Sequence, residues 1–215
     1  MFIFKINAVT NIIAFIIGCV YYKNFSKEIK IVFYFVALGV FTEIFSRSYK
    51  IFVTQNTGPI GHFYFPMAFF IMGMFYLVTL KDFIKSRYIM ILIILFEIFS
   101  IINVLFIQDL YEFPSVTGSV GAIIMFLFSV LFFTKVMTEA KILKLSKEPL
   151  IWINSAVLIY YTGNFIFYVL LNYANKHSRE FAILTAKFFS YVNLLFYLLI
   201  AIGFWKVKDN KSEHV

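Results

Sequence analysis

The sequence predicts an all-α fold, a polytopic membrane helix bundle of seven transmembrane helices that forms a single domain over residues 1–215. Hydrophobic residues make up 62% of the 215 residues and charged residues only 14%, whereas soluble domains average about 45–50% and about 25%. Seven apolar segments are also long enough for a bilayer, which a helix crosses with roughly 20 residues. Only short polar joints separate these segments.

The first predicted helix, residues 6–22, is followed by a basic stretch and not by a small-residue cleavage site, so we expect it to be retained. The second, 29–47, and the third, 59–80, flank the joint TQNTGPIGH, whose Gly and Pro are typical of a turn. Pro149 suits the first position of a helix, where no amide proton is needed. The remaining helices are expected at 87–107, 116–135, 149–172 and 181–205.

The Lys and Arg residues predict the orientation, because cytoplasmic joints retain positive charge. Joints one, three and five and the C-terminal tail hold thirteen of them: Lys23, Lys27, Lys30, Lys81, Lys85, Arg87, Lys135, Lys141, Lys144, Lys147, Lys206, Lys208 and Lys211. The opposite side holds Lys5, Arg47, Lys50, Lys176 and Arg179. We therefore expect the N-terminus outside and the C-terminus in the cytoplasm. The net charge of +8 follows from this asymmetry and favours contact with anionic lipid over nucleic-acid binding.

An internal repeat is suggested by two segments that align without gaps at an offset of 120 residues. SKEIKIVFYFVALGVFTEIF at 26–45 and SKEPLIWINSAVLIYYTGNF at 146–165 share seven of 20 positions. So biased a composition produces several matches by chance, and the sequence leaves both readings open. A real repeat would make helices one to three parallel to helices five to seven, with the fourth as a linker, in a 3+1+3 arrangement.

Polar side chains follow one face of the sixth predicted helix. At 100° per residue, Asn154, Tyr161 and Tyr168 fall within about 40° of one line, and Asn164 flanks it. The seventh helix carries a similar face, formed by Lys187, Ser190, Asn193 and Tyr197. Polar groups in lipid either join helices or line a site. Interhelical hydrogen bonding and a ligand-lined cavity therefore both fit, and we expect the two faces to meet.

Two carboxylates lie inside apolar segments. Glu43 precedes Arg47 by one helical turn, which predicts an ion pair near the outer surface. Glu97 lies near the middle of the fourth helix with no basic residue in reach along that helix. We expect it to be uncharged there, and an acidic residue inside the membrane is a candidate functional group.

Several function classes lack the residues that they need. The three histidines are scattered, one cysteine is present, and no GxSxG motif occurs. The sequence therefore predicts no metal site, no cofactor and no catalytic residues. A retinal Schiff base is disfavoured because Asn193 occupies the centre of the seventh helix and Lys187 lies nearer its outer end.

The segments EPLIWINSAVLIYYTGNFIFYVLLNY and LLFYLLIAIGFWKVK resemble a family of small, uncharacterised seven-helix bacterial inner-membrane proteins. The resemblance is strongest over 148–208, and it implies a multi-pass protein of the inner (cytoplasmic) membrane and an association with sensor kinases. GHFYFPMAFFIMG lacks the acidic residue that the third helix of such proteins often carries.

The cytoplasmic joints are too short for a catalytic domain, so we expect any output to pass through a protein partner at the basic inner face. The first hypothesis is a sensory or accessory subunit that binds a small or lipidic ligand within the bundle. A small transporter or channel of 3+1+3 architecture is the alternative, and a lipid-modifying enzyme is less favoured because no catalytic cluster is present. Homo-oligomer formation is left open.

Overall fold

The computed structural model describes the backbone of residues 2–140, 144–177 and 179–211, and the side chains of residues 9–140, 144–170, 180–181 and 183–208. The chain is 88% helical, without a strand among the described residues. Its α-helices are α1 (Phe2–Tyr21), α2 (Lys27–Phe52), α3 (Gly58–Thr79), α4 (Ser86–Ile102), α5 (Ser115–Glu139), α6 (Pro149–His177) and α7 (Arg179–Lys211). Three short helical segments join them: η1 (Tyr22–Asn24), η2 (Asn103–Ile107) and η3 (Leu145–Lys147).

The six helices from α2 to α7 are long and apolar enough to cross a membrane, which identifies a multi-pass membrane protein. The described side chains of α1 begin at residue 9. The described part of α1 is therefore too short to be tested as a membrane span. The predicted helices are all present, and several are longer than predicted. α2 and α7 continue past their apolar parts because a helix does not end where hydropathy falls unless a breaker follows.

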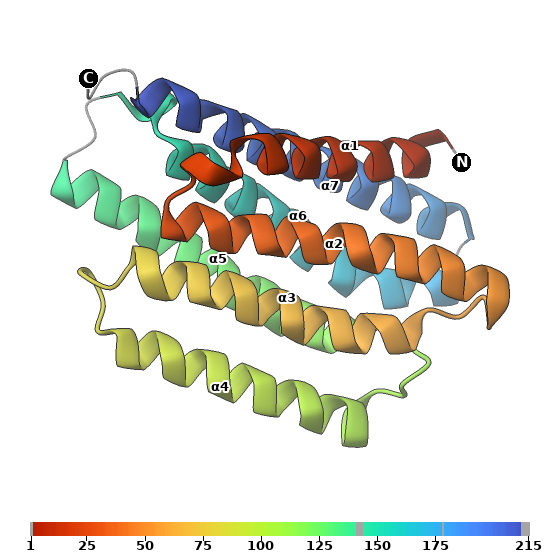
Figure 1. The fold of residues 1–215 in the computed structure, drawn as a ribbon. Helices are drawn as coiled ribbons and strands as arrows, with labels where there is room; N and C mark the ends of the chain where they lie inside the picture. Colours follow the sequence, from red (N-terminus) through yellow and green to blue (C-terminus); the bar gives the residue numbers. More distant parts are fainter. Residues whose placement is uncertain (1, 141–143, 178, 212–215) are drawn as a thin grey trace.

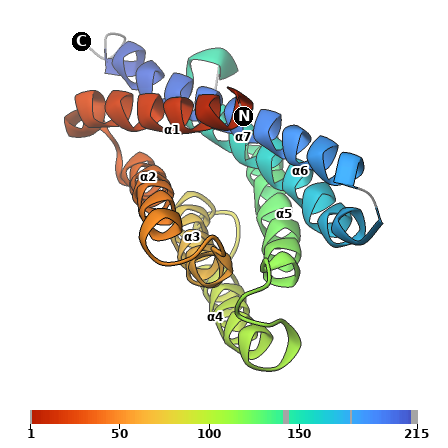
Figure 2. The same cartoon turned by 90° about the vertical axis from the view of Figure 1, so that its right-hand side faces the viewer.

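Six of the helices form a closed ring in the order α1, α2, α3, α5, α6, α7, with α7 back against α1. α4 packs on α3 outside this ring and lies at the edge of the molecule in both views (Figure 1, Figure 2). Successive helices alternate in direction, so α1, α3, α5 and α7 end at the same end of the bundle. We call this end the basic end, because the described joints at it hold Lys23, Lys81, Lys85, Lys144 and Lys147.

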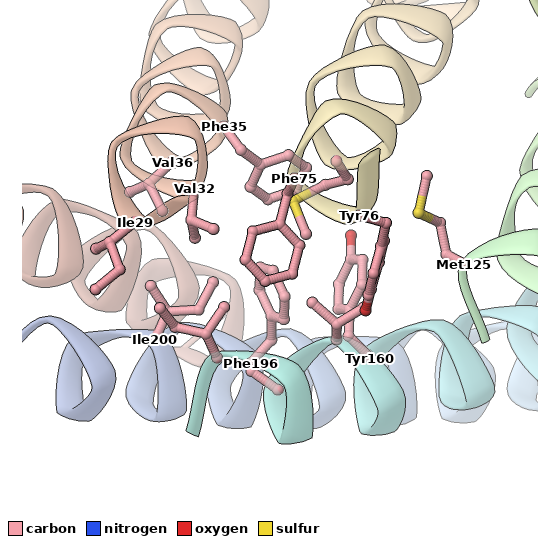
Figure 3. Close-up of a cluster of buried hydrophobic side chains, with 14 of the residues drawn as sticks. Ile29, Val32, Phe35, Val36, Phe75, Tyr76, Met125, Tyr160, Phe196 and Ile200 are labelled. Carbon is pink, nitrogen blue, oxygen red and sulfur yellow. The ribbon is translucent and has the colours of Figure 1, made fainter. Parts of the chain in front are cut away.

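The centre of the ring is filled by aromatic and aliphatic side chains (Figure 3). Phe35 of α2, Phe75 and Tyr76 of α3, and Phe196 of α7 are each at most 1% exposed. Phe35 and Phe196 meet edge to face, with ring centroids 5.8 Å apart. The middle of the bundle is therefore a packed layer and not a pore.

Within the described part of the chain, the most extensive helix contact is between α6 and α7, where Gly163 faces Val192. A Cβ atom at Gly163 would lie 2.8 Å from a methyl carbon of Val192. Small residues at such positions let two helix backbones approach closely, and in lipid this packing replaces the hydrophobic drive between helices.

The suggested repeat pairs residues of unequal burial at some positions of its 120-residue offset. Gly39 is buried, whereas its counterpart Ile159 is exposed. Thr42 lines an internal pocket, whereas its counterpart Thr162 is exposed. The register of the alignment therefore gains no support from burial, and the repeat stays a prediction.

The orientation is also a prediction, and reporter fusions test it. Alkaline phosphatase fused after Lys208 should be inactive and a fluorescent protein at the same position bright, because positive joints are retained in the cytoplasm. The same phosphatase inserted after Asn56, in the joint between α2 and α3, should be active. Activity after Lys208 together with inactivity after Asn56 would reverse the orientation.

Candidate functional site

A polar pocket of about 180 Å³ lies between α1, α2, α3, α6 and α7, in the half of the bundle away from the basic end. Its lining combines amide, hydroxyl and carboxylate groups with four aromatic rings: Asn11, Gly39, Thr42, Glu43, Ser46, Tyr64, Tyr160, Phe189, Asn193 and Tyr197. Five helices contribute to it, so the pocket exists only in the assembled ring. We call it the ring pocket.

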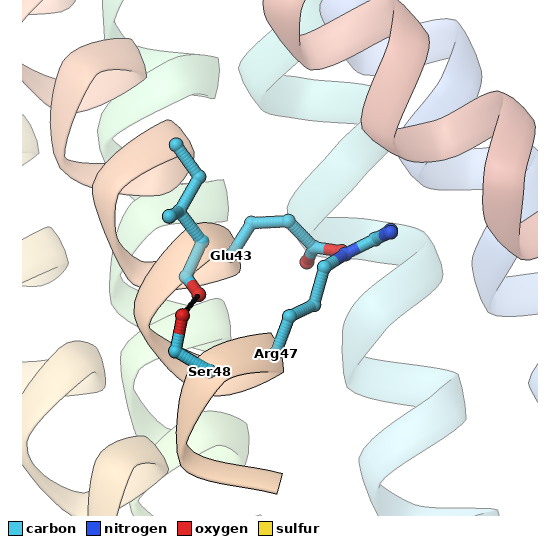
Figure 4. Close-up of polar contacts among 4 residues, drawn as sticks. Glu43, Arg47 and Ser48 are labelled. Carbon is cyan, nitrogen blue, oxygen red and sulfur yellow. Dashed lines mark hydrogen bonds and ion pairs between the residues drawn. The ribbon is translucent and has the colours of Figure 1, made fainter. Parts of the chain in front are cut away.

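Glu43 forms an ion pair at the edge of the ring pocket (Figure 4). Nε and Nη2 of Arg47 both lie 2.7 Å from Oε1 of Glu43, one helical turn away. This contact confirms the ion pair predicted from the spacing of the two residues. The side chains of Glu43 and Arg47 are 46% and 54% exposed. Both donors reach Oε1, which leaves Oε2 of the same carboxylate without a hydrogen bond from Arg47.

Asn11 of α1 contributes a buried amide to the ring pocket. The residue is only 6% exposed, and its Oδ1 has no hydrogen-bond partner among the described residues. A Cβ atom at Gly39 would lie 2.7 Å from the Tyr197 hydroxyl and 3.5 Å from Nδ2 of Asn11. Because Gly39 has no side chain, the Tyr197 hydroxyl and the Asn11 amide can approach the backbone of α2. Burying an unmatched amide oxygen costs free energy, so Asn11 is a group that a ligand or water would satisfy.

An aromatic layer closes the ring pocket on the side toward the basic end. The rings of Tyr160 and Phe196 pack with centroids 4.2 Å apart and their planes tilted by 32°. Beside Tyr64 and Tyr160, between α3, α5 and α6, lies a small void of about 20 Å³ that Tyr161 and Tyr168 also line. That is space for about one water molecule. The ring pocket therefore does not continue past Tyr64 and Tyr160 toward α5 as ligand-sized space.

The predicted polar face of α6 points at α3 and α5. Tyr76 of α3 donates a hydrogen bond of 2.7 Å to Oδ1 of Asn154. Nδ2 of Asn154 donates to the Ser129 carbonyl of α5 at 3.0 Å, and Ser129 Oγ donates to the Asn154 carbonyl at 3.2 Å. Tyr168 lies in the same direction, 5.5 Å from Phe65 of α3 between ring centroids. Asn154 thus joins three helices and does not meet α7, contrary to the expected pairing of the two polar faces.

A different face of α6 meets α7. Tyr160 contacts Phe196, and Phe167 stacks on Phe189 at 4.5 Å. Asn164 lies between these two contacts, is fully buried, and neither of its amide atoms has a partner among the described residues. Its place in the register puts it opposite the turn of α7 that carries Asn193, beside the ring pocket.

The polar face of α7 divides between three roles. Asn193 and Tyr197 line the ring pocket. Ser190 is buried and donates to the Ala186 carbonyl of its own helix at 3.0 Å. Lys187 is exposed and lines none of the described pockets.

Glu97 is half-buried on α4, outside the ring and apart from the ring pocket. Its Oε1 is buried without a partner in the described part of the chain. No group of three His, Cys, Asp or Glu that could hold a metal ion occurs among the described residues.

Sequence reasoning missed several residues of the ring pocket: Asn11, Thr42, Ser46, Tyr64, Tyr160 and Phe189. Asn11 carried the clearest signal, since an Asn within an apolar segment is costly unless it meets a polar partner. Tyr64 and Tyr160 carried none, because tyrosines are frequent throughout this chain.

Comparison with protein families, with curated proteins and with solved structures finds no match to this chain. The resemblance to seven-helix bacterial proteins therefore stays a prediction, and the geometry of the ring pocket has to carry the functional argument.

Asn154→Leu should lower the free energy of unfolding by about 1 kcal/mol, because interhelical hydrogen bonds in membranes average about 0.6 kcal/mol and two side-chain bonds are lost. Unfolding in lipid–detergent mixtures measures this. Thr162→Val is the matched control, since Thr162 is exposed on the same helix and bonds only to the Leu158 carbonyl. Equal stability of the two variants would contradict a joining role for Asn154.

Proposed function

We propose that the chain is a sensory or accessory subunit of the bacterial inner membrane that binds a small ligand in the ring pocket and acts through a protein partner. The observation that carries this proposal is the ring pocket itself, with its unsatisfied Asn11 amide and its Glu43 carboxylate. Polar groups at membrane depth are costly, and they persist where they bind something. In the predicted orientation the ring pocket lies in the outer half of the bundle.

The route from the ring pocket to a partner runs along the packed helices. At the basic end a separate cavity of about 280 Å³ lies between the ends of α3 and α5, with charged groups in its wall. There Lys135 Nζ donates to the Thr79 carbonyl at 2.7 Å, at the end of α3 where unpaired carbonyls attract cations. α3 therefore links Tyr64 in the ring pocket to a charged surface on which a cytoplasmic partner would dock.

Ligand binding is tested with three head-sized probes, choline, glycerol and acetate, on the chain in lipid nanodiscs. At least one should raise the melting temperature, because a ligand at a hundred times its Kd stabilises the folded state by about 2.7 kcal/mol. Tyr197→Phe should weaken this effect, since Tyr197 lines the ring pocket.

The matched control is Tyr191→Phe, the same change at an exposed position of α7. It should leave the effect of the probe intact. If no probe stabilises the wild-type chain, or if both variants respond like wild type, the ring pocket is not a binding site and the proposal fails.

A transporter is the second candidate, favoured by the two cavities at opposite ends of the bundle and by the place of α4 outside the ring. The cavities share no lining residue, and the buried layer of Phe35, Tyr76 and Phe196 lies between them. A 3+1+3 transporter would alternate access across such a layer, with α4 as the linker helix.

Proteoliposomes separate the two candidates. A receptor should bind whichever of the three probes stabilises it, without accumulating the radiolabelled probe above the level of protein-free vesicles. Uptake that is lost in Tyr197→Phe and retained in Tyr191→Phe would establish transport and displace the sensory proposal.

A further inference from the structure

An apolar groove of about 400 Å³ runs along α2 and α3 on the outside of the ring. Its wall includes Leu38, Phe41, Phe45 and Tyr49 of α2, and Phe63 and Met67 of α3. Phe41 and Phe63 are 66% and 71% exposed, so the groove opens toward lipid. Leu38 to Tyr49 spans about 16 Å of helix at 1.5 Å per residue, which is close to the depth of one leaflet of a bilayer about 30 Å thick.

The groove and the ring pocket adjoin each other. Thr42 of α2 and Tyr64 of α3 line both of them. A molecule that reaches between α2 and α3 at these two residues therefore touches the polar interior with one part and the lipid-facing groove with another.

The sizes of the two spaces point to a shared ligand. Sites for drug-sized ligands measure about 300–1,000 Å³, and the ring pocket has about 180 Å³. It has room for a head group and not for a whole molecule of that class. The groove, at about 400 Å³, supplies the remaining space, and its wall suits a hydrocarbon chain.

The lining of the ring pocket suits a cationic head group. Four aromatic rings surround it, those of Tyr64, Tyr160, Phe189 and Tyr197. Aromatic faces attract quaternary ammonium groups, and more strongly where the site excludes water. Glu43 adds a carboxylate whose pairing with Arg47 uses one oxygen, and Arg47 itself is not part of the lining. The described lining thus holds one acidic group and no basic group, which favours a cationic head over an anionic one.

We propose that the ligand is a single-chain amphiphile whose ammonium head occupies the ring pocket and whose alkyl chain lies in the groove between α2 and α3. The inference rests on the proposed function and names the class of molecule that the ring pocket takes. Entry is lateral, from the bilayer past Thr42 and Tyr64.

The head group decides the specificity of such a site. An alkyl chain gains little by moving from lipid to the groove, because lipid tails are as apolar as the groove wall. The alkyl chain instead concentrates the ligand in the membrane, and does so more strongly with each added CH₂. A gain in affinity over choline is therefore no proof of groove binding, and the position of the chain has to be observed directly.

Photolabelling locates the alkyl chain of the ligand. The probe is dodecyltrimethylammonium with a diazirine on its chain, added to the wild-type chain in nanodiscs of phosphatidylethanolamine and phosphatidylglycerol, which carry no choline. Labelling of the groove residues Phe45 and Met67 is measured by mass spectrometry as a ratio to labelling of Ile94 and Leu95, which are exposed on α4. The ratio cancels differences in membrane concentration.

Excess choline should lower this labelling ratio about tenfold, because it displaces the ammonium head from the ring pocket. Glu43→Gln should lower the ratio to a similar extent, which is the scale of a lost pairing between close charges. Glu112→Gln, at an exposed acid outside the ring pocket, should leave the ratio unchanged. The competition by choline needs no variant, so a misfolded Glu43→Gln chain does not remove the test.

A ratio that choline leaves unchanged would mean that the groove takes up ordinary bilayer chains, and it would overturn the inference. Equal groove labelling by a diazirine analogue of dodecyl sulfate would overturn the ammonium head. In either case, stabilisation by glycerol or acetate that depends on Tyr197 would leave the proposed function standing, whereas failure of all three head-sized probes would remove the function as well.

Discussion

The hydrogen bonds of Asn154 join α3, α5 and α6 at one point inside the bundle, and the arrangement of the ring depends on them. Hydrocarbon offers no partner to an amide, so Asn154 has to find partners within the protein. It finds Tyr76 on one side and the Ser129 backbone on the other. Because both amide atoms are engaged, the rotation of α6 about its own axis is set by this contact.

That rotation decides which residues of α6 meet α7. With Asn154 turned toward α3 and α5, Tyr160, Gly163 and Phe167 face α7. Tyr160 then packs against Phe196 and completes the aromatic layer beneath the ring pocket. The ring pocket is thus a consequence of helix packing. Its polar groups lie on one side of the aromatic layer, and the layer itself is filled by ring side chains.

The polar residues of this chain have two roles, one in joining helices and one in lining the ring pocket. Those whose groups pair with another helix or with their own backbone, such as Asn154 and Ser190, stabilise the bundle. Asn11 has an unmatched oxygen in the ring pocket, and Glu43 stands at its edge. The difference is one of partners, since Asn154 and Asn11 are both almost fully buried amides.

The sequence by itself determined the helical fold, its membrane setting and the Glu43–Arg47 pair, because apolar length and the spacing of one helical turn are local properties that any packing preserves. It also marked Asn193 and Tyr197 as inward-facing. It mispaired the face of α6, because a polar stripe shows that a helix needs partners but not which neighbour holds them. Only the tertiary structure placed Asn11, Tyr64 and Tyr160 around one pocket, since these residues are far apart in the chain and approach one another only when the ring closes.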